Sequence, residues 1–218
     1  LDYYSQSLKI QKQLGFNRGI AKSLNNIGVV YEEQGDYPKA LDYFSQSLKI
    51  QKQLGYQSGI AKSLNNIGLI YQNQGDYPKA LDYYIQSLKI KEQIGDQNGI
   101  AGSLINIGLI YKEQGDYPKA LVFCEKGYQL ALSIGSLLAQ KHTCQCLYDT
   151  YKALGNSNKA LAYHELLNAI DDSLDAEKTG KKLQQMEFSK QVFADSIASA
   201  EKERLIEEAH QEEVRQGE

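Results

Sequence analysis

The chain has 218 residues, a formal net charge of −3 at neutral pH and a pI near 5.7. This acidic balance provides no general basic face for a phosphate backbone, so nucleic-acid binding is disfavoured. No apolar run approaches the roughly 20 residues that span a bilayer, and the N-terminus lacks the pattern of a signal sequence. We therefore expect no direct insertion of this chain in a membrane.

An eight-residue stretch divides the chain into repeats of 40 residues. The stretch Gln34-Gly35-Asp36-Tyr37-Pro38-Lys39-Ala40-Leu41 recurs unchanged at residues 74–81 and 114–121, and a divergent copy begins at Gly155. A fixed period of this length indicates a stacked-repeat protein. The repeats are a half repeat at 1–18, units at 19–58, 59–98 and 99–138, and a divergent unit at 139–178.

Each unit contains two predicted helices, helix A and helix B, which are joined at the repeated turn. In the first complete unit, the apolar residues of helix A recur at the three-four spacing of one buried stripe. Gly35 ends helix A, Asp36 caps helix B, and Pro38 lies in the first turn of helix B. The small residues Gly28 and Ala40 allow the two helices to approach closely.

The packing positions of the units resemble the tetratricopeptide repeat. In the first unit, the residues that fit its pattern are Leu24, Ile27, Gly28, Tyr31, Ala40, Phe44 and Ser47. The usual tryptophan is Leu here, and Lys52 and Glu92 replace the proline that ends helix B, as in the longer, ~40-residue form of the repeat. Kinesin light chains and bacterial signalling proteins contain similar arrays. The resemblance implies an all-α, right-handed superhelical solenoid of antiparallel helix hairpins, followed by a long C-terminal helix.

In such a stack the A helices line a concave groove, and the groove residues are those beside the packing positions. These candidates are Lys22, Asn25, Asn26, Val29, Glu33, Lys62, Asn65, Asn66, Leu69, Asn73, Ile105, Asn106, Leu109, Glu113, His142, Gln145 and Asp149. Asn26, Asn66 and Asn106 form a ladder at one repeat position, and an amide can bond both the N–H and the C=O of an extended peptide. The alternative is that each asparagine bonds only to a neighbouring helix or to water.

We expect the groove to bind a protein or peptide ligand. Some related arrays hold a C-terminal carboxylate between lysines, asparagines and an arginine. That clamp is disfavoured here, because Asn25 and Asn65 stand at one lysine place and Asn106 at the arginine place. The predicted binding residues are, in order, the ladder Asn26, Asn66 and Asn106, then Lys22 and Lys62, then Asn25 and Asn65.

The fourth unit diverges, as the capping unit of an array must, and Tyr148 stands at its glycine place. Three cysteines, Cys124, Cys144 and Cys146, are too few for a disulfide framework and have the pattern of small buried residues. His142 and Cys146 share a helix face, but no second cluster supplies the remaining ligands of a closed zinc site. No catalytic or nucleotide-binding fingerprint is present. We predict a non-enzymatic chain without a metal or another cofactor.

We predict two domains, a repeat array at 1–170 and a charged helical segment at 171–218. The three-four spacing along the second segment forms a seam of Leu183, Met186, Phe193, Ile197 and Ala200, which Lys190 and Arg204 interrupt. This seam suits either a coiled coil or an amphipathic helix that folds back to cap the last hairpin.

The segment containing Asp172-Ser173-Leu174, Glu177-Lys178 and residues 181–188 resembles the region after the repeats in bacterial, Bacteroidetes-like sensor proteins. In those proteins a membrane helix, a coiled coil and a nucleotidyl cyclase or histidine kinase follow. The resemblance implies an interaction module, cytoplasmic or periplasmic, in the sensory or regulatory region of a larger signalling protein. Both chain ends look cut, as expected for such a piece. A stand-alone scaffold or adaptor, and a homodimer through the C-terminal helix, are the alternatives.

Overall fold

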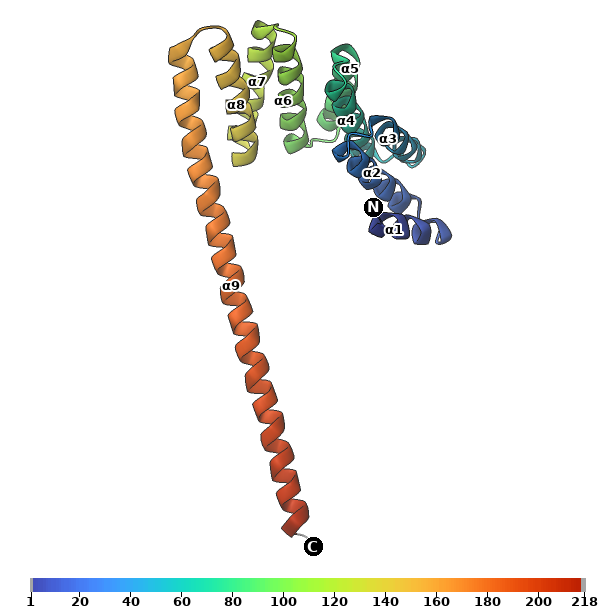
Figure 1. The fold of residues 1–218 in the computed structure, drawn as a ribbon, viewed down its shortest axis with the longest axis vertical. Coiled ribbons are helices and arrows are strands. Elements are labelled where there is room, and N and C mark those ends of the chain that lie inside the picture. The colour runs from blue at the N-terminus through green and yellow to red at the C-terminus, as the bar shows by residue number, and fades with distance from the viewer. Residues whose placement is uncertain (1, 217–218) are drawn as a thin grey trace. The chain divides into compact units, whose positions relative to one another are not determined.

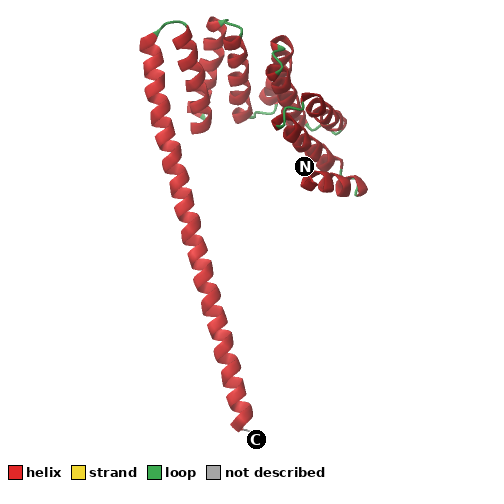
Figure 2. Cartoon of the chain, viewed as in Figure 1, coloured by secondary structure: helices red, strands yellow, loops and turns green. Residues whose placement is uncertain are grey.

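The structure is a computed structural model that describes the backbone of residues 2–216 and the side chains of residues 3–182, 184–189 and 191. In this part the elements are helices joined by short turns (Figures 1 and 2). They are α1 (Asp2–Gln13), α2 (Asn17–Glu33), α3 (Tyr37–Gln53), α4 (Gln57–Asn73), α5 (Tyr77–Gln93), α6 (Gln97–Glu113), α7 (Tyr117–Ser133), α8 (Leu137–Ala153) and α9 (Ser157–Gln216). The A helices are α2, α4, α6 and α8, and each packs with the B helix that follows it. The predicted all-α stack of helix hairpins is therefore confirmed.

The repeated turn closes one helix and opens the next. Gly35 has a φ of +75°, and Gly75 and Gly115 have nearly the same value, which a residue with a Cβ adopts only with strain. The N–H groups of Gly35 and Asp36 donate to carbonyls in the last turn of α2, as in a Schellman motif. The Asp36 carboxylate then accepts from the N–H of Lys39 at 3.2 Å and caps α3. The turn thus reverses the chain with its terminal backbone groups paired.

Small residues bring the two helices of a hairpin together. A Cβ added to Gly28 would lie 2.6 Å from a ring carbon of Phe44, and one added to Gly68 would lie 2.9 Å from the ring of Tyr84. Ala40, on the B side of the first hairpin, has no exposed surface. The two helices therefore approach closely at these small residues, as predicted, and the aromatic side chain of helix B occupies the space beside the glycine.

Each B helix also packs against the A helix of the next unit. Phe44 of α3 clusters with Ile70 of α4, and Tyr84 of α5 clusters with Ile110 of α6. The Tyr84 hydroxyl donates to Oε1 of Gln72 at 2.7 Å, so its polar end is paired although the ring is buried. Burial raises the pKa of Tyr84 well above its usual range. Because each unit completes the core of its neighbour, stability depends on adjacent units.

Two stacked tyrosines and a lysine cover the side of each of the first two hairpins. Tyr31 and Tyr43 stack with ring centroids 5.4 Å apart, and Lys39 Nζ lies 5.0 Å from the Tyr31 ring. Lys39 also pairs with Asp36 at 2.6 Å, and this hydrogen bond lowers the pKa of the Asp36 carboxyl. The same stacked pair recurs as Tyr71 with its partner in α5. The periodic tyrosines are therefore packing residues.

The fourth hairpin is built differently. Tyr148 takes the place that glycine holds in the other units, and its ring centroid lies 5.3 Å from that of His164 on α9. An aromatic pair thus replaces the contact between a glycine and an aromatic ring.

The chain divides into two compact units, residues 1–170 and residues 171–218, and α9 contributes to both. In the second unit, Met186 is 51% exposed. The other predicted seam residues lie outside the described side chains, so the coiled coil stays a prediction; they are Leu183, Lys190, Phe193, Ile197, Ala200 and Arg204. Over the described residues, no helix is both long and apolar enough to cross a bilayer.

Candidate functional site

Two pairs of A helices from adjoining units contact each other directly, α2 with α4 and α6 with α8. In the described part of the chain, the B helices α3, α5 and α7 make no comparable contacts with one another. A stack whose A helices lie closer together than its B helices curves with the A helices inside. The side chains of α2, α4, α6 and α8 that point away from the B helices therefore form the concave surface of the array, which we call the A-helix face.

Most predicted groove residues lie on this face. Lys22 and Lys62 are exposed. Asn25 and Ile105 differ from the prediction, because only 3% and 6% of their surfaces are exposed, and they lie beneath the face at the seam between neighbouring A helices. The half-buried asparagines are Asn26, Asn65, Asn66 and Asn106.

The asparagine ladder is held by bonds between consecutive units. Asn66 Nδ2 donates to Asn25 Oδ1 at 3.1 Å, and Asn106 Nδ2 donates to Asn65 Oδ1 at 3.3 Å. Asn66 and Asn106 are thus fixed through their N–H₂ groups, and their own carbonyl oxygens accept no hydrogen bond from the described residues. The bonding to a neighbouring helix that the sequence left as an alternative accounts for one end of the amides of Asn66 and Asn106.

A buried polar chain, which the sequence analysis did not predict, lies beneath the ladder. Ser47 donates to the backbone carbonyl of Ala21 at 2.7 Å, and Gln51 Nε2 donates to the Ser47 hydroxyl at 3.0 Å. Ser63 of the next A helix donates to Gln51 Oε1 at 2.9 Å. A serine and a glutamine four residues apart on helix B were the available signal. These bonds fix how α2, α3 and α4 are rotated against one another.

The next unit repeats this arrangement with a buried charge. Lys91 replaces the glutamine, and its Nζ donates to Ser103 at 2.8 Å and to Asn65 at 3.4 Å. Only 8% of the Lys91 surface is exposed. Burial lowers the pKa of Lys91, and the charge of Asp96 opposes this effect.

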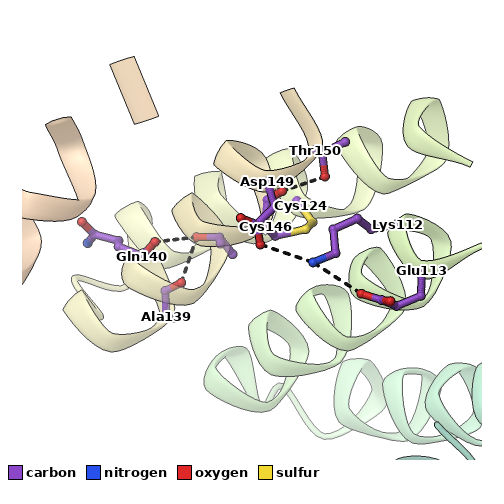
Figure 3. The surroundings of a disulfide bond; sticks show 9 residues. Lys112, Glu113, Cys124, Ala139, Gln140, Cys146, Asp149 and Thr150 are labelled. Atoms are coloured by element: carbon purple, nitrogen blue, oxygen red, sulfur yellow. Dashed lines mark hydrogen bonds and ion pairs between the residues drawn. A yellow bond between two sulfur atoms is a disulfide. The ribbon is translucent and has the colours of Figure 1, made fainter. Parts of the chain in front are cut away.

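The far end of the face carries an ion pair and a covalent link (Figure 3). Lys112 of α6 pairs with Asp149 of α8 at 3.3 Å, and Gln145 donates to the same carboxylate at 2.9 Å. Close by, Cys124 of α7 and Cys146 of α8 form a disulfide with Cα atoms 6.1 Å apart (Figure 3).

The disulfide corrects the expectation of three separate buried cysteines. All three cysteines are buried, as predicted, but only Cys144 is a free thiol, and burial raises its pKa to about 11. The disulfide engages Cys146, whose thiolate would have been the partner of His142 in a metal site. Among the residues that the structure describes, no three His, Cys, Asp or Glu side chains gather as a metal site requires.

The repeat positions, the hairpins and the A-helix face together define a helical repeat protein. Residues 1–53 and 59–133 match the family model described as tetratricopeptide repeat. The chain therefore belongs to the tetratricopeptide repeat family. No curated protein matches it in sequence.

Solved structures share the fold at low sequence identity. BtubC (BKLC) from P. vanneervenii is similar with a TM-score of 0.66 and 20% identity, over 73% of this chain and 66% of that one. A Rap protein in complex with Competence and Sporulation Factor has a TM-score of 0.57 and 20% identity, over 80% of this chain and 59% of that one. Kinesin light chain-like repeats from Podosopora anserina have a TM-score of 0.61 and 17% identity, over 79% and 86%. The chain thus spans less than two thirds of the length of the first two proteins.

Proposed function

We propose that this chain binds an extended peptide segment of a partner protein along the A-helix face. The observation that supports this most is the asparagine ladder, in which Asn66 and Asn106 use their N–H₂ groups but not their carbonyl oxygens. Asn66 and Asn106 are oriented by a bond to the preceding unit, while their carbonyl oxygens have no donor among the described residues. An extended peptide offers backbone N–H groups that suit these oxygens. Asn26, which has no preceding asparagine to bond, presents both ends of its amide.

The neighbouring structures support this class of ligand. The Rap protein was solved with Competence and Sporulation Factor, and its repeats share the fold of this chain. We infer that the contact is non-catalytic, because the described side chains of the face include no nucleophile paired with a base.

The finer proposal is that the chain is the sensory or regulatory region of a larger bacterial signalling protein. In this proposal, peptide capture on the array alters the position or pairing of the segment after residue 171. The Cys124–Cys146 disulfide favours a periplasmic array over a cytoplasmic one, since disulfides persist in oxidising compartments. The gene sequence beyond the Glu218 codon tests the proposal. A membrane helix and an output domain there would support it, whereas a stop codon would favour a stand-alone adaptor.

Selection from a displayed library of random twelve-residue peptides tests the binding site. We expect the full chain to enrich a peptide family, and the Asn26→Ala, Asn66→Ala, Asn106→Ala triple variant to lose it. Each lost hydrogen bond to a ligand typically weakens binding by roughly 1 kcal/mol, so three together abolish enrichment.

A matched control removes three exposed amides from the B helices, through Gln46→Ala, Gln53→Ala and Gln86→Ala. Circular dichroism first establishes that all variants are folded. Enrichment that survives in the ladder variant, or that disappears in the control, would place the binding site elsewhere.

A further inference from the structure

A pocket of about 270 Å³ opens at the first seam between A helices, beside the turn that joins α3 to α4. Arg18 and Lys22 from α2 and Lys62 from α4 line it, and no acidic side chain does. The three cations are exposed at the pocket rim. Like charges gathered in a small concave space repel one another unless an anion joins them.

The pocket has a defined wall. The Arg18 guanidinium lies 4.1 Å from the ring centroid of Tyr56, which is half-buried in the turn before α4. A guanidinium stacked on an aromatic ring directs its N–H groups outward in its own plane, where a ligand can bind those that Tyr56 does not engage. Hydrogen bonding with Arg18 and Ser58 lowers the pKa of Tyr56, which agrees with a positive surrounding. Ser58 also lines the pocket and adds a hydroxyl donor.

A buried amide beneath the rim lacks a partner. Asn25 lines the pocket, and its Nδ2 is buried without a hydrogen bond in the described structure, although its Oδ1 accepts from Asn66. An unpaired buried N–H group costs free energy that a hydrogen-bond acceptor recovers. The pocket thus offers donors from four side chains and a hydroxyl, and it needs an acceptor.

The fold does not require these residues, because the third unit dispenses with them. The repeat positions of Asn25 and Lys22 carry Ile105 and Gly102 in that unit, and the position of Tyr56 carries Asp96 one repeat later. With these residues in place, α6 is still a complete helix that packs against α7 and α8. Among these corresponding positions, three cations without an acidic residue occur at the first seam alone.

We propose that this pocket is an oxyanion subsite, which receives the carboxylate or phosphate group of a side chain on the bound peptide. This inference rests on the proposed function, because Asn25 connects the pocket to the ladder through Asn66. Arg18 donates in a bidentate manner to two oxygens of the anion, and Lys22 and Lys62 neutralise its charge. Asn25 donates its spare N–H group to the same anion.

Nuclear magnetic resonance titration of the full chain with inorganic phosphate and with glutarate, at constant ionic strength, tests the pocket without a peptide. We expect saturable shifts of the Asn25 side-chain amide and of the Arg18 side chain. The anion that saturates at the lower concentration identifies the preferred group, phosphate or carboxylate. Shifts that never saturate would overturn the proposal.

Two variants assign the binding to the pocket. Lys62→Gln should weaken binding of the preferred anion about tenfold, since it removes one charge-assisted contact. Asn25→Ile introduces the residue that the third unit has at this position, so it should fold normally and also weaken binding. The control Lys49→Gln changes the same charge at an exposed position of α3 and should leave binding unchanged. If Lys49→Gln weakened anion binding as much as Lys62→Gln does, the loss would come from overall charge and not from the pocket.

The peptide library separates this inference from the proposed function. Peptides enriched by the unaltered chain should contain Asp or Glu at one fixed position, and Lys62→Gln should remove that preference while other positions stay enriched. If phosphate is the preferred anion, a peptide with a phosphorylated residue at that position should bind more tightly still. Enrichment without any acidic preference would overturn the subsite alone. A library that yields no enriched peptide would overturn the proposed function and the peptide-borne subsite, even if free anions bound.

Discussion

One buried position shows how single residues differentiate nearly identical units. Gln51 and its counterparts Lys91 and Ala131 stand at the same repeat position, and all three are buried. The glutamine both donates and accepts within its polar chain, whereas the lysine can only donate and carries a charge. The alanine needs no partner. The second unit therefore holds a buried charge that its neighbours avoid.

We predict that Lys91→Gln stabilises the chain at neutral pH. The lowered pKa of Lys91 means that the folded state binds its proton less tightly than the unfolded chain, whose lysine pKa is 10.5. The charge therefore costs stability below the folded-state pKa, and this cost disappears as the pH rises from that value to 10.5. Urea unfolding should show the largest gain near pH 7 and a shrinking gain towards pH 10.5.

The exposed neighbour supplies the comparison for this effect. Lys89→Gln removes the same charge from the surface of α5, so its stability relative to the unaltered chain should not change across this range. A pH-independent difference for Lys91→Gln would show that the lysine is charged equally easily in both states.

The glycine between the two helices of a hairpin is a second single residue that affects the stability of the chain. Gly68→Leu should destabilise the chain by roughly 1–3 kcal/mol or more, because a Cβ there already lies 2.9 Å from the Tyr84 ring. Gly102→Leu is the matched control, since nothing lies within 4 Å of its added Cβ and leucine favours a helix. Thermal unfolding should therefore show a loss for Gly68→Leu only, and equal losses would mean that hairpin spacing is not the cause.

At the scale of helices, the parts that follow from local chemistry were predictable. The turn at Gly35 and Asp36, the hairpins and the buried stripes depend on residues close in sequence, and the structure confirms them. The burial of Asn25 and the polar chain through Gln51 were not predicted. They depend on how neighbouring helices rotate against each other, which one periodic pattern does not specify. The pairing of Cys124 with Cys146 depends on the same rotation.

The disulfide joins α7 to α8 and should strengthen the divergent end of the array. The disulfide closes a loop between two cysteines with a sequence separation of 22, and reduction releases this constraint on the unfolded chain. We therefore predict that reduction lowers the free energy of unfolding by roughly 3 kcal/mol. Denaturant unfolding with and without a reductant measures this difference. Cys144→Ala should keep the response to reductant, because Cys144 is a free thiol, whereas a Cys124→Ala, Cys146→Ala double variant should lose it.

At the scale of the whole molecule, the array and the C-terminal segment have different sources of order. The array buries its core between units, whereas the described side chains from Asp175 to Lys182 are exposed. A boundary near residue 171 stays a prediction from composition. The pocket at the first seam was not predicted, because Arg18, Tyr56 and Lys62 come from different helices and turns and meet only in the stack.

This difference predicts that the array does not need the segment after it. Removal of residues 180–218 should leave the thermal midpoint of unfolding within about 2 °C of the full chain, since no buried side chain in the described part is lost. The truncated chain should also keep its enriched peptides, because the A-helix face lies within residues 1–170. Light scattering on both forms tests the role of the segment in assembly. A dimeric full chain with a monomeric truncated form would assign pairing to this segment, whereas a truncated form that stays dimeric would assign it to the array.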